Sequence, residues 1–119
     1  KAKVIIPADI VALNDLIKLE NEKVWQKGNI KEYHSKISEI VRRYTEKRFN
    51  FLALEITTDE ILTEIKTLIN KKQLEHLKII LQRADLAKFA KKKPINDENL
   101  ESMSLAKDFV NNTKKKKDE

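Results

Sequence analysis

Apolar residues recur every three or four positions through most of this chain, a spacing that predicts amphipathic α-helices. Five segments with this spacing follow one another, with polar or turn-forming residues between them. The sequence therefore predicts an all-α fold, a compact bundle of about five amphipathic helices. The residues expected to face inward are Ile10, Leu13, Leu16, Ile17 and Val24, then Ile30, Tyr33, Ile37, Ile40, Val41 and Tyr44, then Ile61, Leu62, Ile65, Leu68 and Ile69, then Leu74, Leu77, Ile80, Leu81, Ala84 and Phe89, and finally Leu100, Met103, Ala106 and Val110.

Capping signals place the ends of the early helices. Gly28 is the only glycine in the chain, and it is expected to end the first helix in a left-handed conformation, with Asn29 capping the second. Thr57 and Glu60 have the spacing of a capping box, in which a hydroxyl and a carboxylate each accept a bond from an unpaired backbone N–H. Between these helices, the apolar run 49–54 has no clear period and predicts a connection that packs on the core.

Later breaks are signalled by polar residues and proline. The polar trio 70–72 interrupts the third apolar stripe and predicts a break there. Pro94 disfavours helix at Lys93, and Asp97 is expected to cap the last helix. These signals predict a lead-in over residues 1–7, one helical domain over 8–113 and a mobile basic tail over 114–119.

The composition agrees with a single helical domain. The chain has 119 residues, of which 40% are hydrophobic and 37% charged, with one glycine and two prolines. It has no cysteine, which excludes disulfides, thiolate metal sites and a cysteine nucleophile. No stretch approaches the roughly 20 apolar residues that cross a bilayer.

Few residues suggest catalysis. His34 and His76 fall on different predicted helices without a second metal-type ligand at i+4, and both are expected at the surface or at the edge of the core. A loop that cradles phosphate needs several glycines, and this chain has one. The serines lie in predicted helices, without the glycine-bearing turn that a serine nucleophile needs. We therefore predict that the domain is not an enzyme and needs no cofactor.

Basic residues are in excess by 25 − 19 = +6, and they gather in runs at 91–93 and 114–117. The second predicted helix also carries a strip of four basic residues. This strip has two interpretations, a partner-docking surface or a charged exterior in which one arginine pairs with a carboxylate at the edge of the core. The residues predicted to bind a partner are Trp25, Arg42, Arg43, Lys47 and Arg48. Nucleic-acid binding through the basic patches is the alternative function.

Three blocks of the sequence resemble a bacterial membrane-protein family. Residues 25–34 resemble the family pattern W-x-x-G-x-x-K-E-Y-Y, residues 41–49 resemble L-R-R-Y-x-E-x-R-F, and residues 53–62 match A-L-E-x-T-T-D-E-I-L. Residues 81–110 resemble the closing block of that family, so the similarity covers about 17–113. His34 departs from it, because the family often has a second tyrosine there.

The resemblance implies a cellular context. Members of this family are typically encoded beside MoxR-type AAA ATPases and von Willebrand factor A proteins, as in the Bacteroides aerotolerance operon. The domain would be the cytoplasmic C-terminal segment of a membrane-anchored protein, at the inner membrane, with residues 1–7 next to the bilayer. Its partner would be the AAA ATPase or a sibling membrane protein. The resemblance supplies no catalytic residues.

Overall fold

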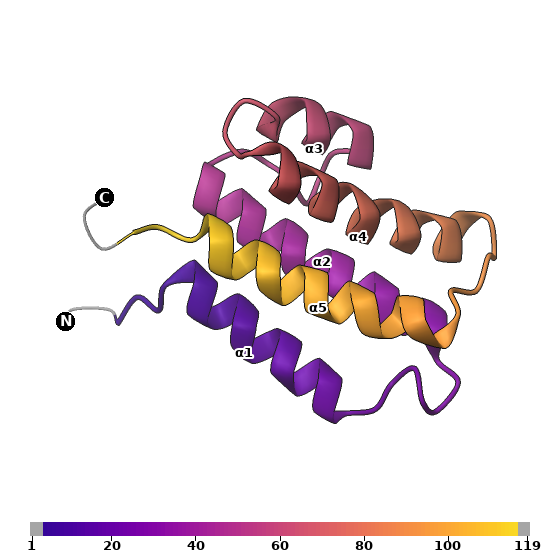
Figure 1. Cartoon of the computed structure of the whole chain (residues 1–119). Helices are drawn as coiled ribbons and strands as arrows, with labels where there is room; N and C mark the ends of the chain where they lie inside the picture. The colour runs from indigo at the N-terminus through magenta and orange to yellow at the C-terminus, as the bar shows by residue number, and fades with distance from the viewer. Residues whose placement is uncertain (1–3, 117–119) are drawn as a thin grey trace.

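The computed structural model describes residues 4–116 and contains five α-helices (Figure 1). The predicted all-α bundle is thereby confirmed. The lead-in and tail predicted at 1–7 and 114–119 reach residues 1–3 and 117–119, which lie outside the described part. The helices are α1 (Ala8–Asn21), α2 (Ile30–Phe49), α3 (Thr58–Ile65), α4 (Lys71–Phe89) and α5 (Asn96–Thr113).

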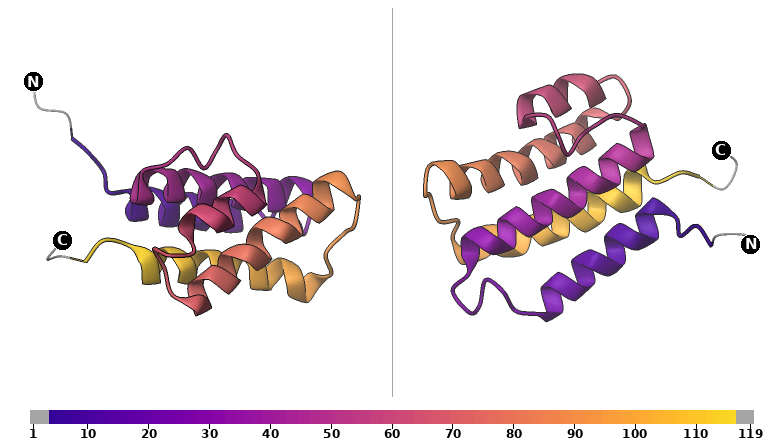
Figure 2. Two further views of the ribbon diagram at one scale, coloured as in Figure 1. Left: turned by 90° about the horizontal axis from the view of Figure 1, so that it is seen from above. Right: turned by 180° about the vertical axis from the view of Figure 1, so that it is seen from behind.

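The second helix, α2, is the centre of the bundle and packs against α1, α4 and α5. Helices α1 and α4 run antiparallel to α5, whereas α2 runs parallel to it, and the short α3 packs on α4 (Figures 1 and 2). Both ends of the described chain therefore emerge at the same end of the bundle.

The core is built mainly from aliphatic side chains, together with Phe109 and two tyrosines of α2. Tyr33 and Tyr44 are almost fully buried, as predicted, and each hydroxyl is paired. Tyr33 donates to the Asn99 carbonyl oxygen at 2.9 Å, and the Tyr44 hydroxyl lies 2.9 Å from the Thr113 hydroxyl. The Tyr44 ring also meets Phe109 edge to face. Because buried hydroxyls need partners, these bonds fix the register of α2 against α5.

The prediction of the inward face was wrong for part of α1. Its buried residues are Ala12, Leu16 and Leu19, whereas Ile10 and Ile17 are 45% and 46% exposed. Helix α1 lies at the edge of the bundle and packs against α2 and α5. Its neighbours therefore cover one narrow side of the helix. Three other residues predicted to face inward are exposed by more than half, namely Leu68, Phe89 and Leu100.

Several helix ends differ from the prediction by a few residues. The first helix already ends at Asn21, although Gly28 does adopt the predicted left-handed conformation with φ +94°. The third ends at Ile65, and Asn70 caps α4 by accepting a bond from the Gln73 N–H at 2.8 Å. Asp97 does not cap α5. The N-cap position is Ile95, two residues before Asp97, and the Glu98 carboxylate accepts a bond from the Ile95 N–H.

The capping box at the start of α3 is confirmed. The Glu60 N–H donates to the Thr57 hydroxyl at 3.2 Å, and the Thr57 N–H donates to the Glu60 carboxylate at 2.9 Å. We expect Thr57→Ala to lower the free energy of unfolding by about 0.5–2 kcal/mol, because it leaves a helix donor without its side-chain acceptor. Chemical denaturation measures this difference. Thr63→Ala, at an exposed position inside the same helix, is the control and should change stability by less than about 0.5 kcal/mol.

Candidate functional site

Arg42 ties the connection between α2 and α3 to the bundle. Asn50 ends α2 in a left-handed conformation, and the chain then folds back over the side of α2. The Arg42 guanidinium donates to the carbonyl oxygens of Ile56 at 2.7 Å and Ala53 at 3.3 Å. It also donates to the Thr58 hydroxyl at 3.1 Å. The two carbonyl oxygens lie outside the helices, and Arg42 supplies the hydrogen-bond donor that a helix would otherwise supply.

The same guanidinium is linked to α4 through Thr58. The Thr58 hydroxyl donates to the Asp85 carboxylate, so α2, α3 and α4 meet in one polar network. Burial lowers the pKa of Arg42, and the nearby Asp85 carboxylate opposes that shift. Arginine remains charged in proteins, so the network holds a cation that the Thr58 hydroxyl bridges to a carboxylate.

An open groove lies above this network. It has a volume of about 650 Å³ and runs between α2, the connection and α4. Its polar lining includes Arg42, Thr58 and Asp85, and its apolar lining includes Leu54 and Phe89. Phe89 is 73% exposed and Leu54 is 37% exposed. We call this feature the α2–α4 groove. Aromatic residues are enriched at protein interfaces relative to the rest of the protein surface.

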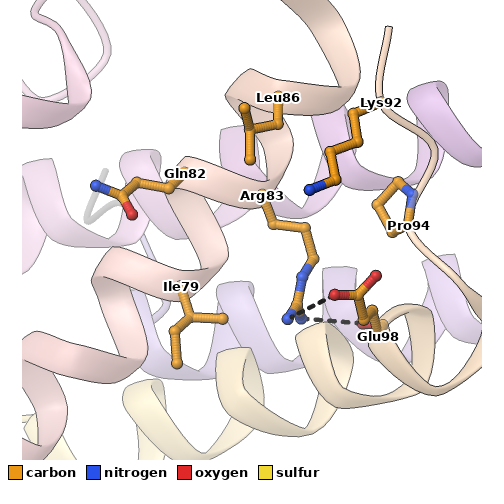
Figure 3. Close-up of a pocket in the computed structure, with 7 residues that line it drawn as sticks. All are labelled: Ile79, Gln82, Arg83, Leu86, Lys92, Pro94 and Glu98. Carbon is orange, nitrogen blue, oxygen red and sulfur yellow. Dashed lines mark hydrogen bonds and ion pairs between the residues drawn. The ribbon is translucent and has the colours of Figure 1, made fainter. Parts of the chain in front are cut away.

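A smaller hollow lies between α4 and the connection to α5, with a volume of about 220 Å³. Arg83 donates to the Glu98 carbonyl oxygen and the Ser102 hydroxyl, and it pairs with Glu101 at 2.9 Å. Figure 3 shows Arg83 and Glu98 pointing toward each other, with Lys92 directed into the same hollow. Because the Arg83 guanidinium is already paired, we assign it the role of joining α4 to α5.

His34 lies in the core, so the prediction of a surface or edge position was wrong. It is 1% exposed, and its Nε2 atom lies 2.7 Å from Asn99 Oδ1. Since an amide oxygen only accepts, the neutral imidazole carries its proton on Nε2. The physical reason for the error is that α2 is covered on three sides, so its buried face is wider than one apolar stripe.

His34 makes stability depend on pH. Burial lowers the pKa of His34, and the positive charge of Arg83 adds to this shift, while the Asn99 bond and Glu98 oppose it. The unfolded chain therefore binds a proton more readily than the folded chain, and stability falls as the pH drops through about 6.5, the value for an unperturbed histidine. The slope from this residue is at most about 1.4 kcal/mol per pH unit.

Thermal unfolding between pH 8 and pH 5 tests this expectation. The variant His34→Gln has no titrating ring, so its stability should vary less with pH than that of the parent, whatever its absolute stability. Equal slopes for the two proteins would contradict the assignment of His34 as a buried neutral base.

The five residues predicted to bind a partner do not form one surface. Arg42 lines the α2–α4 groove. Arg43 lies on the α1 side and pairs with Glu39 at 2.8 Å, and Lys47 is exposed. Arg48 donates to the Thr113 carbonyl oxygen and stacks on Phe49. Trp25 packs against the core in the turn between α1 and α2, near the opposite end of α2 from Arg48. Arg42 reaches the Asp85 carboxylate through the Thr58 hydroxyl, whereas the second interpretation predicted a direct pair.

Within residues 4–116, no three histidine, aspartate or glutamate side chains gather in a way that could hold a metal ion. No described helix combines the length and the apolar character needed to cross a membrane. The groove was not predicted from the sequence. Its position depends on the path of the 50–57 connection, and the sequence marks that connection only by a loss of helical periodicity.

Comparisons of the chain with family models, curated proteins and solved structures found no match. The function is therefore inferred from the geometry above and from the resemblance in the sequence.

Proposed function

We propose that this domain is a non-enzymatic protein-interaction module whose docking site is the α2–α4 groove. The observation that carries the proposal is the exposed aromatic ring of Phe89 beside the groove. Aromatic side chains are enriched in the energetically important centres of protein interfaces, because they bury a large area at a small entropic cost. Leu54 supplies a second apolar contact from the connection.

The floor of the groove supports binding rather than catalysis. The guanidinium of Arg42 and the hydroxyl of Thr58 are used in bonds that hold the connection in place. A fixed floor pre-organises the surface and lowers the entropic cost of association. The exposed Lys88, Glu39 and Glu55 around it offer both signs of charge, which suits the polar rim of an interface.

The resemblance supports a choice of partner. We place the domain on the cytoplasmic side of the inner membrane, as part of a membrane-anchored protein. A MoxR-type AAA ATPase, or a sibling membrane protein from the same gene cluster, would present a helix or loop with apolar anchors to the groove. This mode of binding, an apolar side of a segment laid in a groove, is common in helical recognition.

The proposal is tested with a purified MoxR-type AAA ATPase, the partner class that the resemblance implies. Binding to the immobilised domain is measured by interferometry for the parent and for Phe89→Ser. We expect the variant to bind at least tenfold more weakly, because loss of an aromatic anchor typically removes 2 kcal/mol or more, which is about a thirtyfold change.

Leu100→Ser is the matched control. Leu100 is 57% exposed on α5 and does not line the groove, so its replacement should leave affinity within about twofold. Arg43→Ala/Lys47→Ala tests the predicted basic strip separately. If Leu100→Ser weakens binding as much as Phe89→Ser does, or if neither matters, the groove is not the docking site.

A further inference from the structure

One end of the bundle combines exposed aliphatic side chains with lysines. This end, which we call the terminal end, is formed by the start of α1, the end of α2, the start of α4 and the end of α5 (Figures 1 and 2). Two contacts fix this arrangement. Arg48, near the end of α2, donates to the Thr113 carbonyl oxygen at 2.7 Å, and Gln73, near the start of α4, donates to Asp108 at 3.4 Å.

The aliphatic part is the segment before α1. Val4, Ile5 and Ile6 are 92%, 86% and 56% exposed, and they have no regular structure. Pro7 is the residue that precedes α1, so this segment leaves the helix axis and projects from the bundle. Three consecutive large aliphatic side chains in water are unfavourable, and each would gain about tenfold in a binding constant by entering an apolar phase.

The basic part surrounds the place where this segment leaves. Lys114 and Lys115 follow α5 and are exposed, and Lys114 has an extended backbone that carries the chain away from the helix. Lys71 and Lys72 are exposed in the first turn of α4, and Lys47 is exposed in the last turn of α2. All five lysines belong to the terminal end.

Acidic residues are few at this end. The first turn of α1 contains Asp9, the last turn of α2 contains Glu46, and both are half-buried. Asp108, near the end of α5, is also half-buried and accepts bonds from Gln73 and Asn112. Glu46 also accepts a bond from the Leu54 N–H. The first turn of α4 has no acidic residue. The terminal end therefore presents a positive surface from which an aliphatic segment projects.

We infer that the terminal end binds an anionic lipid surface, with Val4, Ile5 and Ile6 entering the headgroup boundary and the lysines contacting lipid phosphates. Both parts are needed for this assignment. Lysines alone suit any polyanion, but exposed aliphatic residues among them match the junction of acyl chains and charged headgroups. The inference is argued from the exposure and charge of the described residues. It rests on the membrane placement in the proposed function and deepens it, because it assigns the end of the bundle that meets the lipid.

Co-sedimentation with lipid vesicles tests the inference on the whole chain. We expect binding to vesicles of equal parts phosphatidylglycerol and phosphatidylcholine, and little binding to phosphatidylcholine alone. Affinity should fall as salt is raised, because exposed charges are screened. Lys114→Gln/Lys115→Gln should bind roughly 25-fold more weakly, since each lysine near a lipid surface is worth about fivefold.

Two further variants separate the possible causes. Val4→Ser/Ile5→Ser should weaken binding by at least tenfold, because two aliphatic side chains are lost. Lys91→Gln/Lys93→Gln removes the same charge at the opposite end, where both lysines are exposed, and should change the affinity by less than about threefold. Equal losses from the 114/115 and 91/93 variants would overturn the inference, because net charge alone would then explain binding.

A short DNA duplex serves as the competing polyanion. If the duplex binds as tightly as the vesicles, and Val4→Ser/Ile5→Ser affects neither, the terminal end is a nucleic-acid surface and the inference fails. No sedimentation with anionic vesicles at 50 mM salt would overturn it as well. None of these measurements involves the ATPase, so their outcome is distinct from that of the docking test.

Discussion

Arg42→Ala is expected to lower the free energy of unfolding by about 2–3 kcal/mol, because it removes charge-assisted hydrogen bonds and leaves their acceptors unpaired. The carbonyl oxygens of Ala53 and Ile56 would lose their donor, and Ala53 is fully buried. Asp85 would also lose the cation linked to it through Thr58. The connection 50–57 should therefore loosen before the rest of the bundle unfolds.

Arg43→Ala is the matched control for that change. Arg43 is the next residue of the same helix and pairs with Glu39 in an i,i+4 arrangement on the surface. Such pairs contribute about 0.3–0.5 kcal/mol. Urea denaturation measures both variants, and amide hydrogen exchange should show faster exchange in the connection for Arg42→Ala alone. Equal stability of the two variants would contradict the anchoring role of Arg42.

Leu77→Ala is expected to lower the free energy of unfolding by about 2–5 kcal/mol, because it leaves a cavity where α4 packs into the bundle. Leu77 is 1% exposed and belongs to the central hydrophobic cluster. Helix α4 packs against α2, α3 and α5, so the surrounding side chains are held from three directions and cannot easily collapse into the space. Chemical denaturation of the two proteins gives the difference.

Leu100→Ala distinguishes the sequence pattern from the observed packing. Both leucines were predicted to face inward, but Leu100 is 57% exposed. Its replacement should change stability by less than about 0.5 kcal/mol, since it leaves no cavity. A loss at Leu100 comparable to that at Leu77 would mean that the assigned face of α5 is wrong.

Much of the fold could be predicted from the sequence. The spacing in α2 is regular over its whole length, so Tyr33, Ile37, Val41 and Tyr44 were correctly assigned to the core. The capping box at Thr57 was also predicted, because its two side chains act on neighbouring backbone groups. Such local signals depend on few residues and need no knowledge of the tertiary structure.

The sequence was a poorer guide to which face of each helix the neighbouring helices cover. Ile10 and Ile17 follow the helical period, yet the bundle covers a different side of α1. His34 is polar, and its burial requires an acceptor from Asn99, which lies 65 residues away. Sequence spacing identifies which residues share a face of one helix, but it does not identify which face the other helices cover.

The candidate site shows the same limit. Arg42 and Arg43 are adjacent and chemically identical, yet one anchors a connection and the other lies on the surface. What separates them is the angle of about 100° between successive residues on a helix, together with the path that the chain takes after Asn50. The groove exists only because that connection returns across α2, so no pattern of residue types alone could have located it.

The measurement that tests the central claim most directly is a nuclear magnetic resonance titration of the isotope-labelled domain with an unlabelled MoxR-type AAA ATPase, the proposed partner. We predict that amide signals change first at the α2–α4 groove, around Leu54, Thr58, Asp85 and Phe89, while signals at Trp25 and along the outer face of α1 stay unchanged. Changes confined to the basic residues Arg43 and Lys47, or no changes at a saturating ATPase concentration, would contradict the groove as the docking site.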